Sequence, residues 1–104
     1  MQTLLFSYRA ASHLPGKRAQ AIVGVVASGD LEVLLQRTSQ STDCVVTVST
    51  AVRGFDEIWE AVIADFVERR APGGLRISIN DGGARPDVVA LRLAQGLRLM
   101  GEDT

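Results

Sequence analysis

The chain has very few of the residues that build disulfide frameworks and metal sites. Its 104 residues include one cysteine, Cys44, and one histidine, His13. A single cysteine cannot form an internal disulfide, which agrees with a reducing compartment. A lone imidazole cannot supply the ligand set of a metal site, so no metal site is predicted. Cys44 opens a β-branched run, where cysteine is usually a small buried hydrophobe.

Charge of one sign and long apolar runs are also missing. Eleven Lys and Arg residues face twelve Asp and Glu residues, which leaves a net charge of −1 and no basic surface for nucleic acid. No apolar run approaches the roughly 18 residues that a membrane span needs. The start of the chain lacks the features of a signal peptide. We therefore expect a cytoplasmic protein with neither a nucleic-acid nor a membrane partner.

What remains is the composition of a small compact protein. Hydrophobic residues make up 46% of the chain and charged residues 22%, which argues against disorder. A chain of this length suits a single hydrophobic core. We expect one domain over residues 1–104.

The hydrophobic pattern predicts five strands and two helices. Strands are expected at residues 4–8, 21–27, 31–36, 45–50 and 75–80. Residues 21–27 are almost continuously apolar, as in a strand that is covered on both faces. The order β-β-β-β-α-β-α predicts an α+β fold, a mainly antiparallel sheet with both helices packed on one face.

Each predicted helix has a recognisable start and an apolar stripe. Asp56 is a natural N-cap for a first helix that Pro72-Gly73-Gly74 ends. Pro86 suits the start of the second helix. The apolar positions at helical spacing are Ile58, Trp59, Val62, Ile63, Phe66 and Val67 in the first helix and Val89, Leu93, Leu97 and Met100 in the second. The residues expected to be buried together are Val23, Val25, Val33, Leu35, Val62, Phe66, Ile77, Leu93 and Leu97.

A small polar turn separates two of the predicted strands. Gly29-Asp30 suits a two-residue hairpin turn of type II′, in which glycine supplies the positive φ of the first central position. Ser28 then lies at the shoulder of the hairpin between two small neighbours, Ala27 and Gly29. We expect its hydroxyl to be exposed and accessible to another enzyme.

The same segment resembles a known attachment site. Residues 28–35, SGDLEVLL, are similar to the prosthetic-group attachment segment of the acyl carrier (δ) subunit of biotin-independent malonate decarboxylase. The similarity extends to residues 1–6, to the helix around Trp59 and to residues 81–96. Ala27 stands where the family usually has glycine, and its methyl group leaves Ser28 accessible. The resemblance therefore covers the whole chain.

The resemblance implies a carrier function without catalysis by this chain. Ser28 would hold 2′-(5″-phosphoribosyl)-3′-dephospho-coenzyme A through a phosphodiester, and the thiol of that group would carry acetyl or malonyl as a thioester. The implied partners are an acyltransferase (alpha) subunit, decarboxylase (beta and gamma) subunits, a malonyl transferase and a prosthetic-group transferase. Tethering would replace diffusion, because a tethered thioester meets each docked active site at an effective concentration of roughly millimolar.

Other interpretations remain open at this point. Ser-Gly-Asp forms turns in many proteins, so a hairpin tip that only docks a partner, in a small interaction module, is one alternative. The acyl carrier subunit of citrate lyase, which bears the same kind of group, is another; the C-terminal half follows the malonate family. An unrecognised serine hydrolase lacks both a suitable histidine and the GxSxG context.

The residues around Ser28 have two possible roles each. Gly29, Asp30 and Glu32 are candidate recognition residues for the attaching transferase, and the two carboxylates are candidates to position a divalent cation; a solvated turn is the alternative. Cations of the first loop, at Arg9, Lys17 and Arg18, would contact the phosphates of an attached group if that loop folds toward the hairpin; ordinary surface cations are the alternative. Asp81-Gly82-Gly83 lacks the spacing of a phosphate-binding loop, so a plain turn is predicted there.

Overall fold

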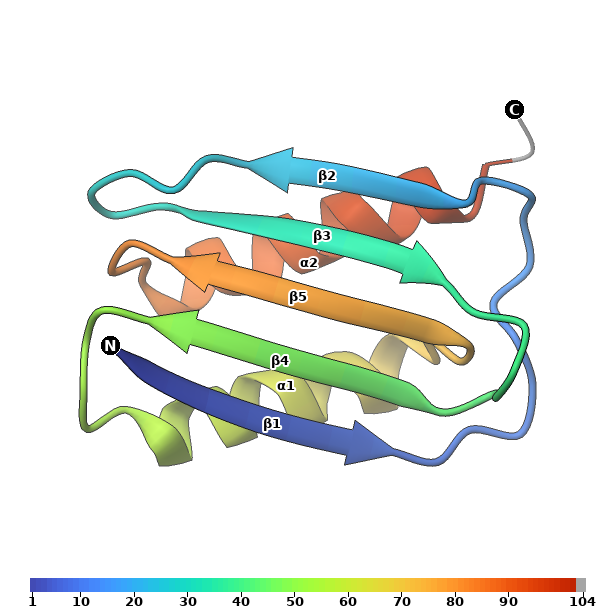
Figure 1. The fold of residues 1–104 in the computed structure, drawn as a ribbon, viewed down its shortest axis with the longest axis horizontal. Helices are drawn as coiled ribbons and strands as arrows, with labels where there is room; N and C mark the ends of the chain where they lie inside the picture. Colours follow the sequence, from blue (N-terminus) through green and yellow to red (C-terminus); the bar gives the residue numbers. More distant parts are fainter. Residues whose placement is uncertain (103–104) are drawn as a thin grey trace.

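The computed structural model describes residues 1–102 of the chain. The predicted element order is confirmed (Figure 1). The elements are β1 (Gln2–Tyr8), β2 (Gln20–Gly24), β3 (Leu31–Arg37), β4 (Cys44–Thr50), α1 (Asp56–Arg70), β5 (Leu75–Asp81) and α2 (Pro86–Met100).

The five strands form one mixed sheet in the order β1-β4-β5-β3-β2. Three of the four neighbouring pairs are antiparallel, and β4 and β5 are parallel because α1 connects them. The sheet is therefore mainly antiparallel, as predicted. The hairpin of β2 and β3 forms one edge, and its connection, residues 25–30, lies at the same end of the sheet as the β4–α1 and β5–α2 connections (Figure 1).

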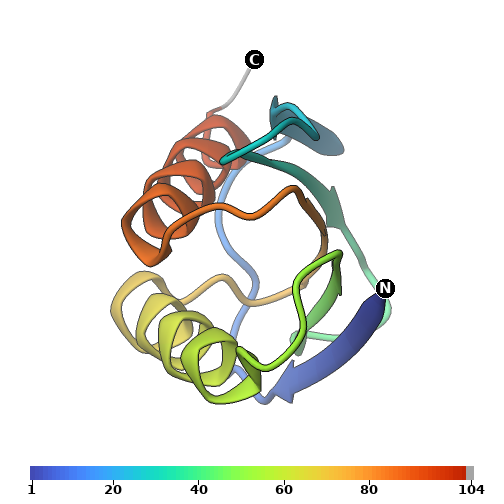
Figure 2. The same cartoon turned by 90° about the vertical axis from the view of Figure 1, so that its left-hand side faces the viewer.

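Both helices cover the same face of the sheet, which gives the fold two layers (Figure 2). Strands β3, β4 and β5 alternate between buried and more exposed positions, so every second side chain enters the core. α2 packs on β2 and β3, and α1 packs beside α2 and on β1. The predicted stripe of α2 is confirmed, with Val89, Leu93, Leu97 and Met100 at most 8% exposed.

The prediction that residues 21–27 form a strand covered on both faces is wrong. β2 ends at Gly24, and Ile22 and Val25 are 58% and 57% exposed. The physical reason is the two-layer fold, in which both helices cover the same face of the sheet and leave the other face of β2 open, while Val25 lies beyond the end of the strand. Val25 therefore lies outside the core that we expected it to join.

Two details of α1 also differ from the prediction. Asp56 is the first helical residue, while Phe55 occupies the N-cap position and no side chain caps the helix. Ile58 is 43% exposed, so the buried stripe of α1 consists of Trp59, Ile63 and Phe66. The remaining predicted core positions are buried except Val23 and Val62, which are partly buried.

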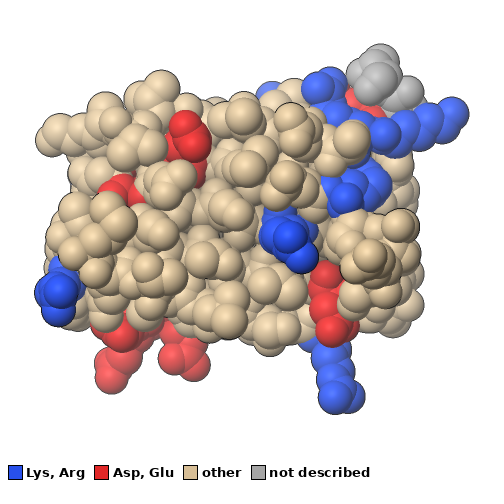
Figure 3. Space-filling model, in the orientation of Figure 1, with Lys and Arg blue, Asp and Glu red and all other residues tan. Residues whose placement is uncertain are grey.

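The opposite face of the sheet carries no helix. Figure 3 views this face, and most of its surface is uncharged, with Lys and Arg gathered at the upper right by the start of β2. None of the helices within residues 1–102 has the length and apolar character to cross a membrane.

Candidate functional site

Ser28 lies on the surface, at the tip of the β2–β3 connection, as predicted. The tip is a β-turn over residues 27–30, closed by a hydrogen bond of 3.0 Å from the Asp30 N–H to the Ala27 carbonyl. Ser28 and Gly29 are its two central residues. Within residues 1–102, no group forms a hydrogen bond with the Ser28 hydroxyl.

The geometry of this turn corrects the predicted type. Gly29 has a φ of +77° and is the third residue of the turn, while Ser28 has no positive φ. A positive φ at the third residue is the pattern of a type II turn and excludes type II′. The turn therefore starts one residue earlier than predicted, and Ser28 sits in its centre instead of at its shoulder.

Backbone hydrogen bonds fasten this turn to the β5–α2 connection. The Gly29 N–H donates to the Gly82 carbonyl at 3.1 Å, and the Gly82 N–H donates to the Asp30 carbonyl at 2.9 Å. Gly82 permits this approach because a Cβ atom there would collide with the carbonyl oxygen of Ala27. The turn predicted at Asp81-Gly82-Gly83 thus stabilises the Ser28 turn through the backbone of Gly82.

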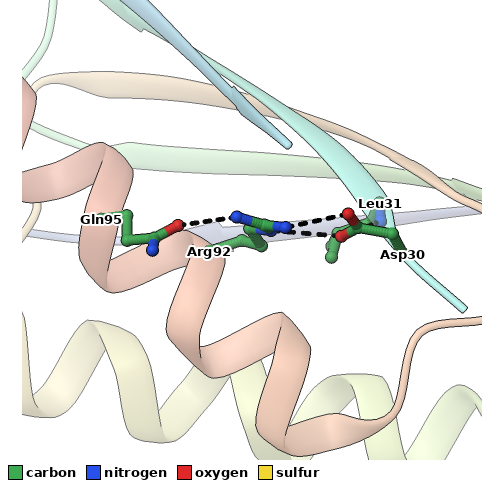
Figure 4. Close-up of polar contacts among 4 residues, drawn as sticks. All are labelled: Asp30, Leu31, Arg92 and Gln95. Atoms are coloured by element: carbon green, nitrogen blue, oxygen red, sulfur yellow. Dashed lines mark hydrogen bonds and ion pairs between the residues drawn. The ribbon is translucent and has the colours of Figure 1, made fainter. Parts of the chain in front are cut away.

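An ion pair fastens the same turn to α2 (Figure 4). The Arg92 guanidinium donates to both carboxylate oxygens of Asp30, at 2.9 and 3.1 Å, and also to the Gln95 side chain at 3.1 Å. The Leu31 N–H donates to Asp30 at 2.7 Å. Both side chains of the pair are mostly shielded, with Asp30 20% and Arg92 28% exposed. These contacts, the Arg92 hydrogen bond first and the Leu31 N–H second, lower the pKa of Asp30.

The Asp30–Arg92 pair predicts a pH-dependent stability. Because the pKa of Asp30 is lower in the folded chain than in the unfolded chain, its contribution is complete above the ordinary carboxyl pKa of about 4 and is lost as the pH falls below it. In Arg92→Met the main cause of the lowered pKa is gone. As the pH falls from about 5 to below the carboxyl pKa, we expect this variant to lose less unfolding free energy than the wild type loses. Denaturant unfolding at a series of pH values measures this.

Arg98→Met is the matched control, because Arg98 is an exposed arginine of the same helix. The control is expected to follow the wild-type pH profile. Identical profiles for Arg92→Met and the wild type would show that the pair does not hold the turn in solution.

The carboxylates of Asp30 and Glu32, which were candidates to position a divalent cation together, point to opposite faces of the sheet. Asp30 is directed toward α2, on the helix side of the sheet. Glu32 is half-buried and, by the alternation of β3, points to the opposite, uncovered face beside Asn80 and Gly24. Residues 1–102 contain no group of three or more metal-ligating side chains. Recognition roles for Gly29, Asp30 and Glu32 stay predictions.

The cations of the first loop lie at the wrong end of the sheet to contact a group on Ser28. Figure 1 places the β1–β2 connection at the end opposite to the β2–β3 connection. Arg18 donates to the Leu99 carbonyl at the end of α2 and pairs with Glu102 at 3.4 Å. The condition that the first loop folds toward the hairpin is therefore not met.

Two residues of the site were not predicted from the sequence. Arg92 and Gly82 contact the turn from positions more than 50 residues further along the chain. Local patterns carry no signal for such contacts. The sequence shows only that Arg92 is a cation next to the predicted buried position of Leu93, which does not identify its partner.

The single cysteine is buried in the core, as predicted from its position. Cys44 is 0% exposed in β4, and burial raises the pKa of its thiol to about 11. A thiol must be ionised and accessible to react. We therefore expect Cys44 not to react in the folded chain, where its side chain packs in the core.

Comparisons with known proteins agree with the resemblance noted in the sequence. The model of the family described as malonate decarboxylase delta subunit matches residues 18–100. A malonate decarboxylase acyl carrier protein of Bradyrhizobium diazoefficiens is 53% identical over 99% of this chain and 98% of the relative. One from Burkholderia cepacia is 55% identical over 78% of this chain and 79% of the relative.

A solved structure has the same fold. A chain in the crystal structure of a Pseudomonas malonate decarboxylase hetero-tetramer in complex with malonate superposes with a TM-score of 0.84 and 42% identity. The match covers 97% of this chain and 100% of the other. The malonate family is thereby favoured over the citrate lyase carrier that the sequence left open. The chain belongs to the malonate decarboxylase delta subunit family and is an acyl carrier subunit of that enzyme.

Proposed function

We propose that Ser28 is the attachment residue of a 2′-(5″-phosphoribosyl)-3′-dephospho-coenzyme A group, joined by a phosphodiester. The observation that supports this most directly is the exposed Ser28 hydroxyl at the tip of a turn that Gly82 and Arg92 hold in place. When bound, the group supplies a thiol that carries acetyl or malonyl as a thioester. The chain itself then acts as a carrier without catalytic residues.

The residues at the tip fit a covalent group of this kind. The Ser28 oxygen is free of hydrogen bonds within the described residues, so an attaching enzyme does not have to break one. Its neighbours in the turn, Ala27 and Gly29, carry a methyl group and a hydrogen atom, which are too small to cover it. A Cβ atom at Gly29 would meet nothing within 4 Å, which indicates open space around the turn.

The structure also suits a carrier that presents its attached group to other proteins. Ser28 must be presented in one geometry to several active sites, and the turn is fixed at three points, by its own hydrogen bond, by Gly82 and by Arg92. The proposed partners are an acyltransferase (alpha) subunit, decarboxylase (beta and gamma) subunits, a malonyl transferase and the prosthetic-group transferase. The solved hetero-tetramer supports other malonate decarboxylase subunits as partners.

A thiol count tests the attachment with little effort. Cys44 is the only cysteine of the chain and is 0% exposed, so the folded, unmodified chain should react with no equivalent of a thiol reagent. After hydroxylamine has removed any acyl group, the folded carrier should react with one equivalent, from the arm. In denaturant the counts should rise to one for the unmodified chain and two for the carrier.

Intact mass completes the test on protein taken from malonate-grown cells of the native host. We expect the mass of the chain plus one phosphoribosyl-dephospho-coenzyme A group, located on the peptide that contains Ser28. An unmodified mass under these conditions would overturn the carrier proposal and favour a docking module. A group on any other residue would overturn the role of Ser28.

Gly29 provides a prediction that separates the shape of the turn from its chemistry. Gly29→Val keeps the Ser28 hydroxyl but places a β-branched residue at a φ of +77°, a conformation that costs about 1–3 kcal/mol for such residues. We expect a folded but destabilised chain that the prosthetic-group transferase loads much more slowly, measured by the rate of mass increase.

Gly29→Asn is the matched control, because asparagine tolerates positive φ and open space surrounds the position. It should be loaded at close to the wild-type rate. Equal loading of the valine variant would mean that the transferase recognises a flexible segment, and the fixed turn would then have no part in recognition.

A further inference from the structure

An apolar pocket lies beside the β5–α2 connection, the segment that also supports the Ser28 turn, and it has no part in the proposed function. It has a volume of about 270 Å³ and opens between the β4–α1 connection, the start of α1 and the β5–α2 connection. Val52, Phe55, Trp59, Ala84 and Val89 form its apolar walls. Phe55 is 45% and Val52 38% exposed, so the apolar wall is accessible from solvent.

The β5–α2 connection links this pocket to Ser28. Gly83 and Ala84 line the pocket, and the preceding residue, Gly82, forms both hydrogen bonds to the Ser28 turn. Figure 2 looks onto this end of the molecule and shows the β5–α2 connection running between the β2–β3 and β4–α1 connections. The β5–α2 connection therefore contacts the Ser28 turn and also lines the pocket.

The polar groups of the pocket are few and specific. Asp81 is one of the lining residues and is 7% exposed, and its carboxylate accepts hydrogen bonds from the Thr50 hydroxyl at 2.8 Å and the Ala84 N–H at 2.9 Å. A carboxylate has about four acceptor sites, so Asp81 can still accept a further donor. At the rim, Arg85 is 81% exposed and pairs with Asp87 at 3.3 Å, which leaves a cation accessible from solvent.

Size and chemistry together point to one flat ring system. Sites for drug-sized ligands have roughly 300–1,000 Å³, so this pocket is too small for a whole nucleotide and large enough for one base. Aromatic and aliphatic walls stack on the face of a base. An acceptor such as Asp81 suits the exocyclic amino group of adenine, and an accessible arginine at the rim suits a phosphate.

We propose that this pocket holds the adenine base of the prosthetic group, an inference that rests on the proposed attachment to Ser28. In that group the phosphoribosyl unit joins Ser28 to the 2′-oxygen of the adenosine, so the base belongs to the part of the arm nearest the protein. The pantetheine part with the thiol remains outside and free to reach partner subunits. The pocket then fixes the adenosine part of the group and leaves the pantetheine part with the thiol mobile.

Trp59 makes the proposal measurable without an activity assay. It is the only tryptophan of the chain and lines the pocket, so one indole N–H signal in a ¹H–¹⁵N spectrum reports on the site. We compare the unmodified chain with carrier whose group has been verified by intact mass. The expected result is a displaced indole signal in the carrier and nuclear Overhauser contacts between the adenine protons and Trp59.

Two variants separate occupancy of the pocket from general effects of the arm. Ala84→Leu fills the pocket and Phe55→Ser removes an exposed aromatic wall; each should return the indole signal toward that of its own unmodified form and abolish the adenine contacts. Ala11→Leu, an exposed alanine of the β1–β2 connection, is the control and should keep both effects. Signal dispersion in each spectrum verifies that the variants are folded.

Each other outcome has a distinct meaning. Carrier of verified mass without adenine contacts and with an unchanged indole signal overturns the pocket proposal and leaves the carrier function intact. Contacts that survive in both pocket variants place the base elsewhere and also overturn it. An indole signal that moves only when partner subunits are added, while the adenine stays mobile, makes the pocket a protein docking site. Absence of the group from protein of the native host overturns both proposals together.

Discussion

Ser28→Ala is expected to abolish loading of the prosthetic group and all malonate turnover in the rebuilt enzyme. The substitution removes the only oxygen at the tip of the turn that can enter a phosphodiester, while the N–H and carbonyl groups that fasten the turn are unaffected. The unfolding free energy should change by no more than about 0.5 kcal/mol, as for other exposed positions without special contacts. Intact mass after incubation with the transferase gives the first result, and turnover the second.

Ser39→Ala is the matched control for this prediction. Ser39 is also an exposed serine, but it lies in the connection between β3 and β4, at the end of the sheet opposite to Ser28. It should be loaded and active like the wild type. Turnover by the Ser28 variant would mean that the arm is attached elsewhere or is not required.

The sequence predicted those parts of the fold that repeat with a regular period. Alternation placed Leu31, Val33 and Leu35 on one face of β3, and all three are 0% exposed. Helical spacing placed the buried stripe of α2 correctly. In both cases each residue's environment depends on which face of its own element it occupies, and local periodicity records this directly.

The prediction failed where the environment depends on distant elements. Val25 and Val26 continue the apolar pattern of β2, yet both are 57% exposed because the strand ends at Gly24. The continuous apolar pattern does not show that β2 ends at Gly24. The turn type failed for a similar reason, since the residues that hold the turn, Gly82 and Arg92, lie far along the chain.

In the candidate site too, the local features were predicted and the long-range contacts were not. Ser28 was predicted as an exposed residue from its small neighbours and from a resemblance that covers the whole chain, and its exposure is confirmed. Its support was not predictable, because the Asp30–Arg92 pair joins residues on different elements. The Asp30 carboxylate is already bound by Arg92, so its first role is to hold the turn on α2. A transferase that recognises Asp30 has to bind it in this geometry.

Phe66→Ala should produce the largest loss of stability among the variants considered. Phe66 is 6% exposed on the buried stripe of α1, within the core between helices and sheet. Removing a core aromatic loses transfer free energy and leaves a cavity, at a cost of about 3–5 kcal/mol. Domains are stable by only about 5–15 kcal/mol, so a large part of the total would be lost. Urea unfolding should show a lower midpoint with an unchanged m-value.

Phe55→Ala is the natural control, because it removes the same side chain from a position that is 45% exposed. Its cost should be about 1 kcal/mol or less. The same unfolding measurement on Phe55→Ser supports the pocket experiment, because a loss of adenine contacts in a stable variant cannot be attributed to unfolding. Similar losses for both phenylalanines would contradict the packing described for α1, because burial is the property in which the two positions differ most.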